Sequence, residues 1–174
     1  MFGHIDDTSR FPRKQWKEVI HIVNGKDYKS VESESGQYPV IGTGGEMARA
    51  TEYLTPEDSI VMGRKGTIDK PFIMKEKYWN VDTAFGVVPH KEIHYQYLFW
   101  YCKQLDYSKL NKATTLPSTT KADLLNLYIN VPDIELQKQF ASLVEQSDKS
   151  KFDCSNRNLS RCLVVRCHWI KDGQ

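Results

Sequence analysis

Short apolar runs that end at glycine or proline recur through the first two-thirds of the chain. The runs 38–42 ("YPVIG"), 59–63 ("SIVMG") and 128–131 ("YINV") have the length of β-strands and are bounded by turn residues. Residues 67–74 ("TIDKPFIM") and 78–89 ("YWNVDTAFGVVP") are also rich in β-branched and aromatic side chains. These runs predict a β-rich domain.

Apolar residues at three- and four-residue spacing predict helices between these runs. Residues 94–110 show this spacing at Tyr97, Trp100, Tyr101 and Leu105. The aromatic residues of this segment are therefore expected to be core residues rather than a platform for stacking bases. Residues 46–58 ("EMARATEYLTPED") fit either a helix or an irregular loop.

The last helix is predicted by an apolar stripe that begins after Pro132. The stripe consists of Leu136, Phe140, Leu143 and Val144, with polar residues between them. It predicts a helix from Asp133 to at least Lys151. The fold class is therefore α+β: a mixed, β-rich domain with short helices, followed by a long C-terminal helix. We expect the domain to span residues 1–132. Residues 133–152 should form the start of the spacer helix, and residues 153–174 an atypical tail.

The overall composition is that of an ordinary globular protein. The chain has 174 residues, of which 40% are hydrophobic, and a formal net charge of +2. Because this charge is small, a nucleic-acid surface would need local clusters of Lys and Arg. The N-terminal segment lacks the apolar core of a signal peptide, and no apolar run is long enough to cross a bilayer. We therefore expect a cytoplasmic protein without a membrane partner.

Three polar segments contain candidate contacts to a phosphate backbone. Two are glycine breaks that follow predicted strands, 42–45 ("GTGG") and 63–67 ("GRKGT"), and the third is 114–121 ("TTLPSTTK"). Each also has a plain structural interpretation: a loop hinge, a β-turn with Lys65 in water, and a helix cap of the form Thr120-x-x-Asp123. In the functional interpretation, exposed amides, hydroxyls and cations bind phosphates. The candidate DNA contacts are Thr43, Gly44, Gly45, Arg64, Lys65, Lys112, Ser118, Thr119, Thr120 and Lys121.

Recognisable catalytic motifs are missing from the sequence. There is no glycine-rich loop for S-adenosylmethionine, no Asp/Asn-Pro-Pro-aromatic motif, and no acid-x-Lys after the one Pro-Asp pair. The segment "GTGGEMARA" lacks the Gly-Lys-Ser/Thr ending of a phosphate-binding loop. Four residues of the tail considered as zinc ligands do not fit the usual spacings: Cys154, Cys162, Cys167 and His168. His90 and His94 lie four residues apart, a spacing open to a zinc pair, but a solvated helix start is the favoured interpretation. We predict a non-catalytic chain with no cofactor and no metal site.

In their order and intervals, several sequence words resemble one half of a DNA-specificity subunit of type I restriction-modification systems. The words are "YPVIGTGG", "GRKGT", "YWNVDTAFGVVP", "YLFWYCKQLD", "LPSTTKADLLNLYINVP" and "PDIELQKQ". The resemblance runs from about Trp16 to Lys151. It implies a target recognition domain followed by half of a coiled-coil spacer.

The resemblance also implies a function and partners. Such subunits usually carry two recognition domains, each of which reads one half of a split site in double-stranded DNA. They have no catalysis of their own, and modification and restriction subunits assemble on them. "GRKGT" and "LPSTTK" match words common to the family, which favours phosphate contact or fold maintenance over base readout. The stripe Leu136, Phe140, Leu143 and Val144 would join a second copy of the chain or a second specificity chain.

Two features depart from the family pattern. The family word Pro-Pro-Leu-x-Glu-Gln is here "PDIELQ", so that Leu136 precedes Gln137 where the family has glutamate. From Asp153 the regular apolar seam stops, as in read-through of a truncated gene. Two other hypotheses therefore stay open: a truncated remnant or protein-interaction module without productive DNA binding, and an enzyme with an unfamiliar site.

Overall fold

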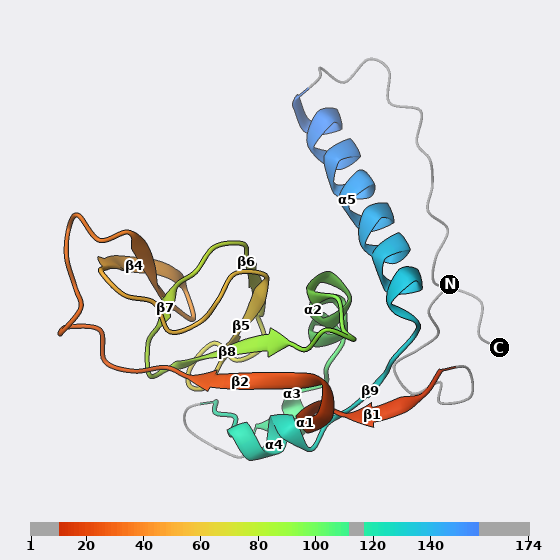
Figure 1. Ribbon diagram of the computed structural model, residues 1–174, viewed down its shortest axis with the longest axis horizontal. Helices are drawn as coiled ribbons and strands as arrows, with labels where there is room; N and C mark the ends of the chain where they lie inside the picture. The colour runs from red at the N-terminus through yellow and green to blue at the C-terminus, as the bar shows by residue number, and fades with distance from the viewer. Residues whose placement is uncertain (1–10, 112–116, 157–174) are drawn as a thin grey trace. The chain divides into compact units, whose positions relative to one another are not determined.

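The computed structural model of the protein describes residues 11–111 and 117–156, with side chains to residue 147 (Figure 1). The predicted DNA contact Lys112 and most of the tail lie outside the described residues.

The strands are β1 (Arg13–Gln15), β2 (Ile20–Asn24), β3 (Tyr38–Gly42), β4 (Gly45–Ala50), β5 (Ser59–Gly63), β6 (Phe72–Met74), β7 (Trp79–Asn80), β8 (Ala84–Pro89) and β9 (Tyr128–Asn130). The helices are α1 (Trp16–Val19), α2 (Tyr95–Lys103), α3 (Tyr107–Leu110), α4 (Lys121–Leu125) and α5 (Ile134–Asn156). The predicted α+β class is confirmed: short helices and strands are interspersed, and one long helix follows them.

Three small sheets make up the β structure. The largest is antiparallel, in the order β2-β8-β5-β6, and its register places Val87 of β8 between Ile22 and Ile60. The second has the order β4-β3-β7, in which β3 and β7 run parallel. The third pairs β1 with β9, which brings the two ends of the domain together.

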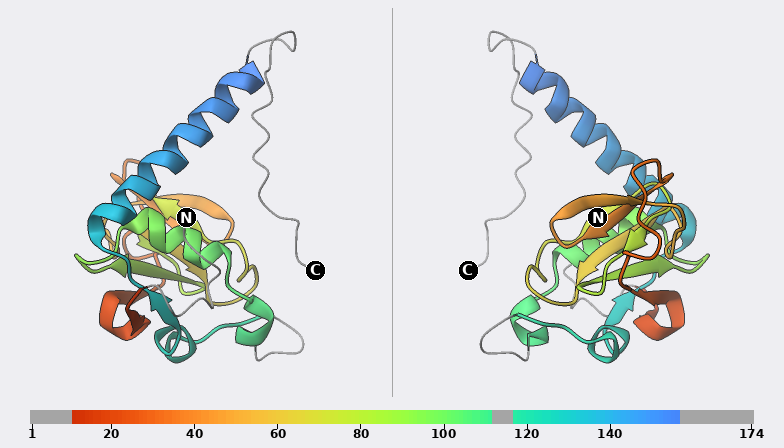
Figure 2. Two further views of the ribbon diagram at one scale, coloured as in Figure 1. Left: turned by 90° about the vertical axis from the view of Figure 1, so that its right-hand side faces the viewer. Right: turned by 90° about the vertical axis from the view of Figure 1, so that its left-hand side faces the viewer.

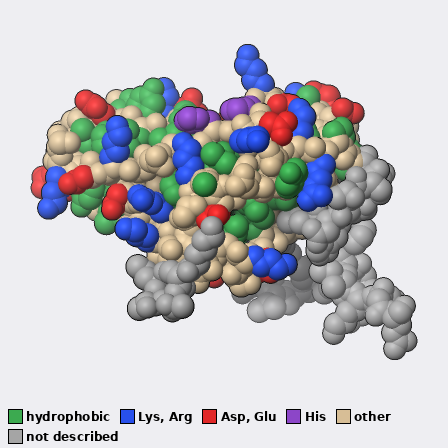
Figure 3. Space-filling model, turned by 90° about the horizontal axis from the view of Figure 1, so that it is seen from below, with side chains coloured by type: hydrophobic (Ala, Val, Ile, Leu, Met, Phe, Trp, Pro, Cys, Tyr) green, Lys and Arg blue, Asp and Glu red, His purple; other side chains and the backbone are tan. Residues whose placement is uncertain are grey.

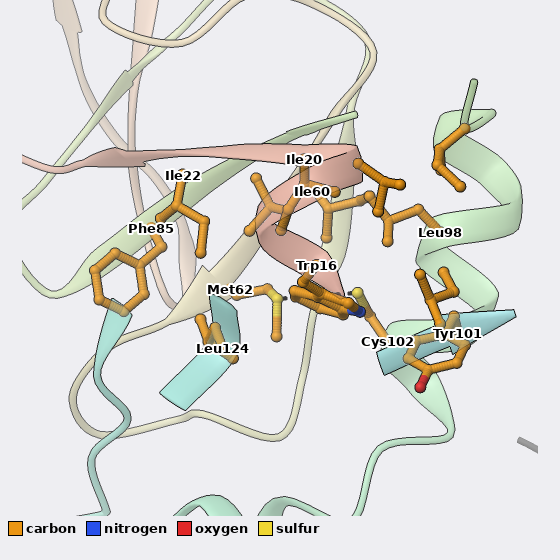
Figure 4. Packing of buried hydrophobic residues seen from close by; sticks show 14 of the residues in the cluster. Trp16, Ile20, Ile22, Ile60, Met62, Phe85, Leu98, Tyr101, Cys102 and Leu124 are labelled. Carbon is orange, nitrogen blue, oxygen red and sulfur yellow. Dashed lines mark hydrogen bonds between the residues drawn. The ribbon is translucent and has the colours of Figure 1, made fainter. Parts of the chain in front are cut away.

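The main core lies between the four-stranded sheet and the short helices. Because side chains alternate along a strand, Ile60 and Met62 of β5 point to this face while Val61 points to the other. Helices α1, α3 and α4 lie on the same side of the strands in the views of Figures 1 and 2. Figure 4 shows the Trp16 indole at the centre of this core, between Met62 and Cys102.

The opposite face of the four-stranded sheet is covered by the second sheet. Val61 and Ala84 pack there against Ile41 of β3 and against Tyr78. Buried polar groups in this region are paired: Thr55 Oγ1 lies 2.7 Å from Asn80 Oδ1, and Asn80 Nδ2 donates to two backbone carbonyls. Burial raises the pKa of Tyr78 to about 12. Residues 78–84 therefore lie between the two sheets, where hydrogen bonds and packing fix them.

Two strands differ from the sequence-based expectations. Residues 45–50, for which a helix or loop was expected, form β4, because the turn at 43–44 folds them back antiparallel to β3. Trp16, Val19 and Ile20 have helix-like spacing in the sequence, which favours a helix that includes Ile20, but α1 ends at Val19 and Ile20 begins β2. The predicted helix 94–110 is divided at Asp106, whose side chain accepts from Ser108 N and begins α3.

Helix α5 begins as predicted, after Asp133, and its first residues are fixed to the domain by a buried side chain. Gln137 is fully buried, and its Nε2 donates to the carbonyls of Glu92 (3.0 Å) and Pro132 (2.7 Å). Its Oε1 accepts from His94 N at 2.9 Å. Phe140 also packs on the domain, edge-on to the rings of Tyr97 and Trp100. The boundary between the two compact units of the chain lies within α5, after Ala141.

Candidate nucleic-acid interface

The segment after β5 makes a tight turn that requires glycine at two positions. A Cβ atom at Gly63 would lie 2.1 Å from the carbonyl oxygen of Thr67, so no larger residue fits. Gly66 has a φ of +81°, a conformation that side chains with a Cβ rarely adopt. The two glycines of "GRKGT" therefore serve the turn itself, as the structural interpretation predicted.

The turn is held from one side by the segment that precedes β8. The amides of Arg64 and Lys65 both donate to Thr83 O, at 2.8 and 3.2 Å. The Arg64 guanidinium donates to Asp82 O at 3.2 Å and lies 6.0 Å from the centre of the Phe85 ring. Because these bonds fix Arg64 to the fold, its charge has a defined position at the edge of the sheet.

The segment 117–119 holds the turn from the other side. Gly66 N donates to Pro117 O, Thr119 N donates to Arg64 O, and Lys65 and Ser118 form an isolated β-bridge. The hydroxyl of Thr119 donates to Gly63 O at 2.7 Å. The structure thus joins two of the three predicted polar segments into one site, which we call the turn site (residues 63–67 and 117–119).

The fold itself uses several of the side chains that were predicted to contact DNA. Thr119 is 4% exposed, and its hydroxyl is bonded within the turn site. Thr120 caps α4: its oxygen accepts from Asp123 N and lies 2.6 Å from the Asp123 carboxylate. The ammonium group of Lys121 donates to Ile22 O at 2.7 Å. These three residues therefore have structural roles that the sequence had suggested for only one of them.

Lys65 and Ser118 of the turn site both carry polar groups that the described fold does not use. The Lys65 side chain is exposed and forms no ion pair with any residue that the structure describes. The backbone amide of Ser118 is already used, because it donates to Asn111 Oδ1 at 3.1 Å. The half-buried Ser118 hydroxyl has no hydrogen-bond partner among the described residues. A cation beside a hydroxyl on a rigid turn is suited to bind an anion.

The remaining predicted segment, which contains Thr43 to Gly45, forms the turn of the β3–β4 hairpin. Gly42 pairs with Gly45, and Gly45 has a φ of +115°. A Cβ atom at Gly44 or Gly45 would meet nothing within 4 Å, so this tip is open on the outside. Among the described residues, no hydrogen bond connects the hairpin tip directly to the turn site.

A cavity of about 370 Å³ lies between the hairpin and the residues that hold the turn site, and we call it the side cavity. It is lined by Asp27, Tyr28, Met47, Val81, Asp82 and Thr83. Sequence reasoning missed it, because its walls come from three distant segments. One signal was present: the apolar run 78–89 is interrupted by the polar pair Asp82 and Thr83.

The described surface has mixed charge. Figure 3 shows Lys and Arg side chains spread among Asp and Glu on one face instead of a single basic patch. Burial raises the pKa of the Cys102 thiol far above its usual range, so this cysteine is a protonated core residue. In residues 11–111 and 117–156 there is no group of three His, Cys, Asp or Glu placed to hold a metal ion. No helix in the same residues could span a membrane.

Solved structures with the same fold come from type I restriction-modification systems. The S subunit from M. genitalium has a TM-score of 0.69 and 14% identity, and the match covers 88% of this chain and 43% of that chain. The HsdS subunit from Thermoanaerobacter tengcongensis has a TM-score of 0.66 and 15% identity, with 88% and 41% covered. A chain solved to show complex assembly and conformational transition of the type I R-M system has a TM-score of 0.69 and 16% identity, with 83% and 40% covered.

This chain therefore spans about two-fifths of the length of the solved chains that it matches. No curated protein sequence matches it. The family model described as the type I restriction modification DNA specificity domain matches residues 11–161, which is well over half of the sequence. This match includes β1 to α5, the turn site and the side cavity, and it agrees with the resemblance found in the sequence words. The chain belongs to the family of type I restriction modification DNA specificity domains.

Proposed function

We propose that this chain recognises double-stranded DNA and reads one half of a split site as the specificity component of a type I restriction-modification complex. Membership of the specificity-domain family supports this function. The observation that carries it is the turn site, in which two distant polar segments meet and present Lys65 to solvent. Recognition of DNA combines phosphate contacts, which position a domain, with base contacts, which specify the sequence.

In this proposal the turn site contacts the phosphate backbone. Lys65 supplies a charge and Ser118 a hydroxyl, while Arg64 adds a second charge whose position is fixed by Asp82 O. A Cβ atom at Gly66 would point into open space, so a polymer can approach the backbone of the turn closely. The bonded side chains Thr119, Thr120 and Lys121 shape the site instead of touching DNA. The open hairpin tip, Thr43 to Gly45, is a second approach point.

The chain itself contributes recognition, and we assign methyl transfer and cleavage to partner subunits. This assignment rests on the family, which is named for specificity, and on the missing catalytic motifs in the sequence. Modification and restriction subunits are therefore the proposed protein partners, and the chain needs no cofactor for its own part.

We also propose that the recognition domain ends at residue 132. In this proposal α5 is a spacer helix that joins the domain to a second DNA-recognition domain. Leu143 is 50% exposed, and such an exposed leucine on a helix is suited to pack against another helix. Phe140 contributes less to this surface than expected, because it packs on Tyr97 and Trp100. Val144 and the half-buried Leu136 complete the stripe.

A binding titration tests the function. The full chain, alone and with the modification subunits of its system, is titrated against random-sequence duplexes of about 30 base pairs in a mobility-shift assay at several salt concentrations. We expect binding that weakens linearly on a log–log salt plot. A map of methylated positions in cells that carry all the subunits then identifies the site. Absence of duplex binding in both preparations would favour the interaction module without productive DNA binding.

A further inference from the structure

The side cavity has a rigid backbone and unused polar side chains. Val81 N donates to Ile41 O, Ala84 N donates to Val81 O, and the carbonyls of Asp82 and Thr83 accept from the turn site. The backbone of residues 81–84 is thus fixed on both sides. The exposed Asp82 carboxylate, in contrast, has no hydrogen bond to any residue that the structure describes. A fixed backbone with a free acceptor is the arrangement expected of a recognition group rather than of a structural one.

The rim of the cavity carries an exposed apolar side chain. Met47 is 61% exposed on β4, next to the hairpin tip, and its Cγ and sulfur lie close to Gly42. The floor is the buried Val81. In the major groove, apolar side chains contact the C5-methyl group of thymine, and cytosine presents a C–H at the same position. The cavity therefore combines an apolar surface with an acceptor, and both lie beside the proposed phosphate-binding turn.

Charge restricts what the Asp82 carboxylate can face. Near a polyanion, an ionised carboxylate is repelled by phosphates unless a donor compensates it. Arg64 offsets part of this charge, because its guanidinium is bonded to the carbonyl of Asp82 itself. The remaining acceptor capacity matches an amino group on a base. Asp27 also lines the cavity, but its Oδ1 already accepts from Lys29 N, which makes Asp82 the better acceptor.

An ionised carboxylate only accepts hydrogen bonds, and this property distinguishes the bases. Cytosine presents its N4 amino donor in the major groove with no acceptor on the same base edge. Adenine presents its amino group beside the N7 acceptor, and guanine and thymine present acceptors, all of which repel a carboxylate. We propose that the side cavity reads one base of the target, with Asp82 accepting from the N4 amino group of cytosine and Met47 covering its C5 edge. This inference rests on the proposed function.

The test is selection of a preferred site from a randomised pool of duplexes by the full chain, under the conditions in which it binds DNA. We expect the wild type to select cytosine at one position at least. Asp82→Asn introduces an amide, which pairs with the N6 and N7 atoms of adenine, and should change the selected base at that position from cytosine to adenine. Asp82→Ala should lose the preference there, by on the order of tenfold, without gaining adenine. Glu34→Gln, which alters an exposed acid outside the cavity, is the matched control.

The outcomes separate the two proposals. If the wild type selects a site and Asp82→Asn leaves the base preference unchanged at every position, the cavity does not read a base, and the proposed function stands. If the wild type retains no duplex from the pool, both are overturned. Because Asp82 is exposed, both variants should melt at the same temperature as the wild type. If both Asp82→Asn and Asp82→Ala melt at a lower temperature, Asp82 has a structural role instead.

Discussion

At the scale of single residues, the turn site separates side chains that build it from side chains that it presents. Thr119 and Lys65 belong to the same turn site, yet Thr119 is buried and bonded to Gly63 O while Lys65 is exposed. The chemistry of the side chain alone would assign both to phosphate binding. Their different surroundings predict different consequences when each is removed.

Removal of the Lys65 charge should weaken DNA binding without affecting its sequence preference. In Lys65→Ala one phosphate contact is lost, so the slope of log affinity against log salt should fall by roughly one for all duplexes. Lys91→Ala removes an equally exposed lysine beyond the other end of β8 and should leave the slope unchanged. Mobility shifts at four or more salt concentrations measure both slopes. A changed base preference in Lys65→Ala would make Lys65 a base-reading residue.

Removal of the Thr119 hydroxyl should instead reduce stability. Thr119→Val keeps the shape of the side chain but leaves Gly63 O without its donor, which costs about 1–3 kcal/mol. Thr67→Val, at an exposed position of the same turn, should change stability by less than about 0.5 kcal/mol. Urea unfolding followed by circular dichroism compares the two variants. If Thr119→Val is as stable as the wild type and binds DNA weakly, the hydroxyl acts on DNA and the structural assignment is wrong.

At the scale of elements, the start of α5 depends on one glutamine. Gln137 hydrogen-bonds to two backbone carbonyls and one backbone amide, and so joins the first turn of α5 to the segment that precedes α2. We expect Gln137→Leu to destabilise the protein by on the order of 3 kcal/mol, because a leucine removes all three hydrogen bonds. Gln139→Leu, on the exposed side of the same turn, is the control. Thermal unfolding of both variants gives the comparison, and equal melting temperatures would contradict the role of Gln137.

The elements also show where sequence reasoning succeeds and where it stops. Local signals identified β3, β5, β9 and the cap of α4, because glycine breaks and the Thr120–Asp123 pair act over a few residues. β4 was missed, because its pairing with β3, rather than its own pattern, makes it a strand. For the same reason, the sequence did not predict the side cavity or the contact between the two polar segments of the turn site. Their contacts join positions far apart in sequence, and no local pattern records them.

At the scale of the whole molecule, the proposed recognition surface is made of separate loops fixed by shared strands. The ends of β5 and β8 hold the turn site, and the residues just before β8 form the wall of the side cavity. The turn site, proposed to bind phosphate, and the side cavity, proposed to read a base, therefore share the backbone of residues 82–83. On this proposal, the shared backbone holds the base-contacting side chain at a fixed distance from the phosphate-contacting turn. A substitution in the side cavity could then change the preferred DNA sequence while the affinity for the DNA phosphates stays constant.

The last prediction concerns assembly through α5. The 23 residues of this helix give a length of roughly 35 Å at 1.5 Å per residue. A split site needs two readers, and a pair of identical chains related by a two-fold axis would read a palindrome with a spacer. Burying a large apolar side chain is worth about 1.5–3 kcal/mol, so Leu143→Asp should disrupt such a pair without altering the domain. Sedimentation equilibrium at micromolar concentrations should show a dimer for the wild type and a monomer for Leu143→Asp.

The choice of Leu143 makes this test specific for the pairing surface. Phe140→Asp would place a charge against Tyr97 and Trp100 and destabilise the domain itself, so a monomer in that variant would have two explanations. Leu143 is half-exposed, and its replacement should leave the melting temperature of the domain unchanged. A wild-type chain that sediments as a monomer at every concentration would exclude the homodimer. The second reader would then have to come from a different specificity chain, and the methylated site in cells would be asymmetric instead of palindromic.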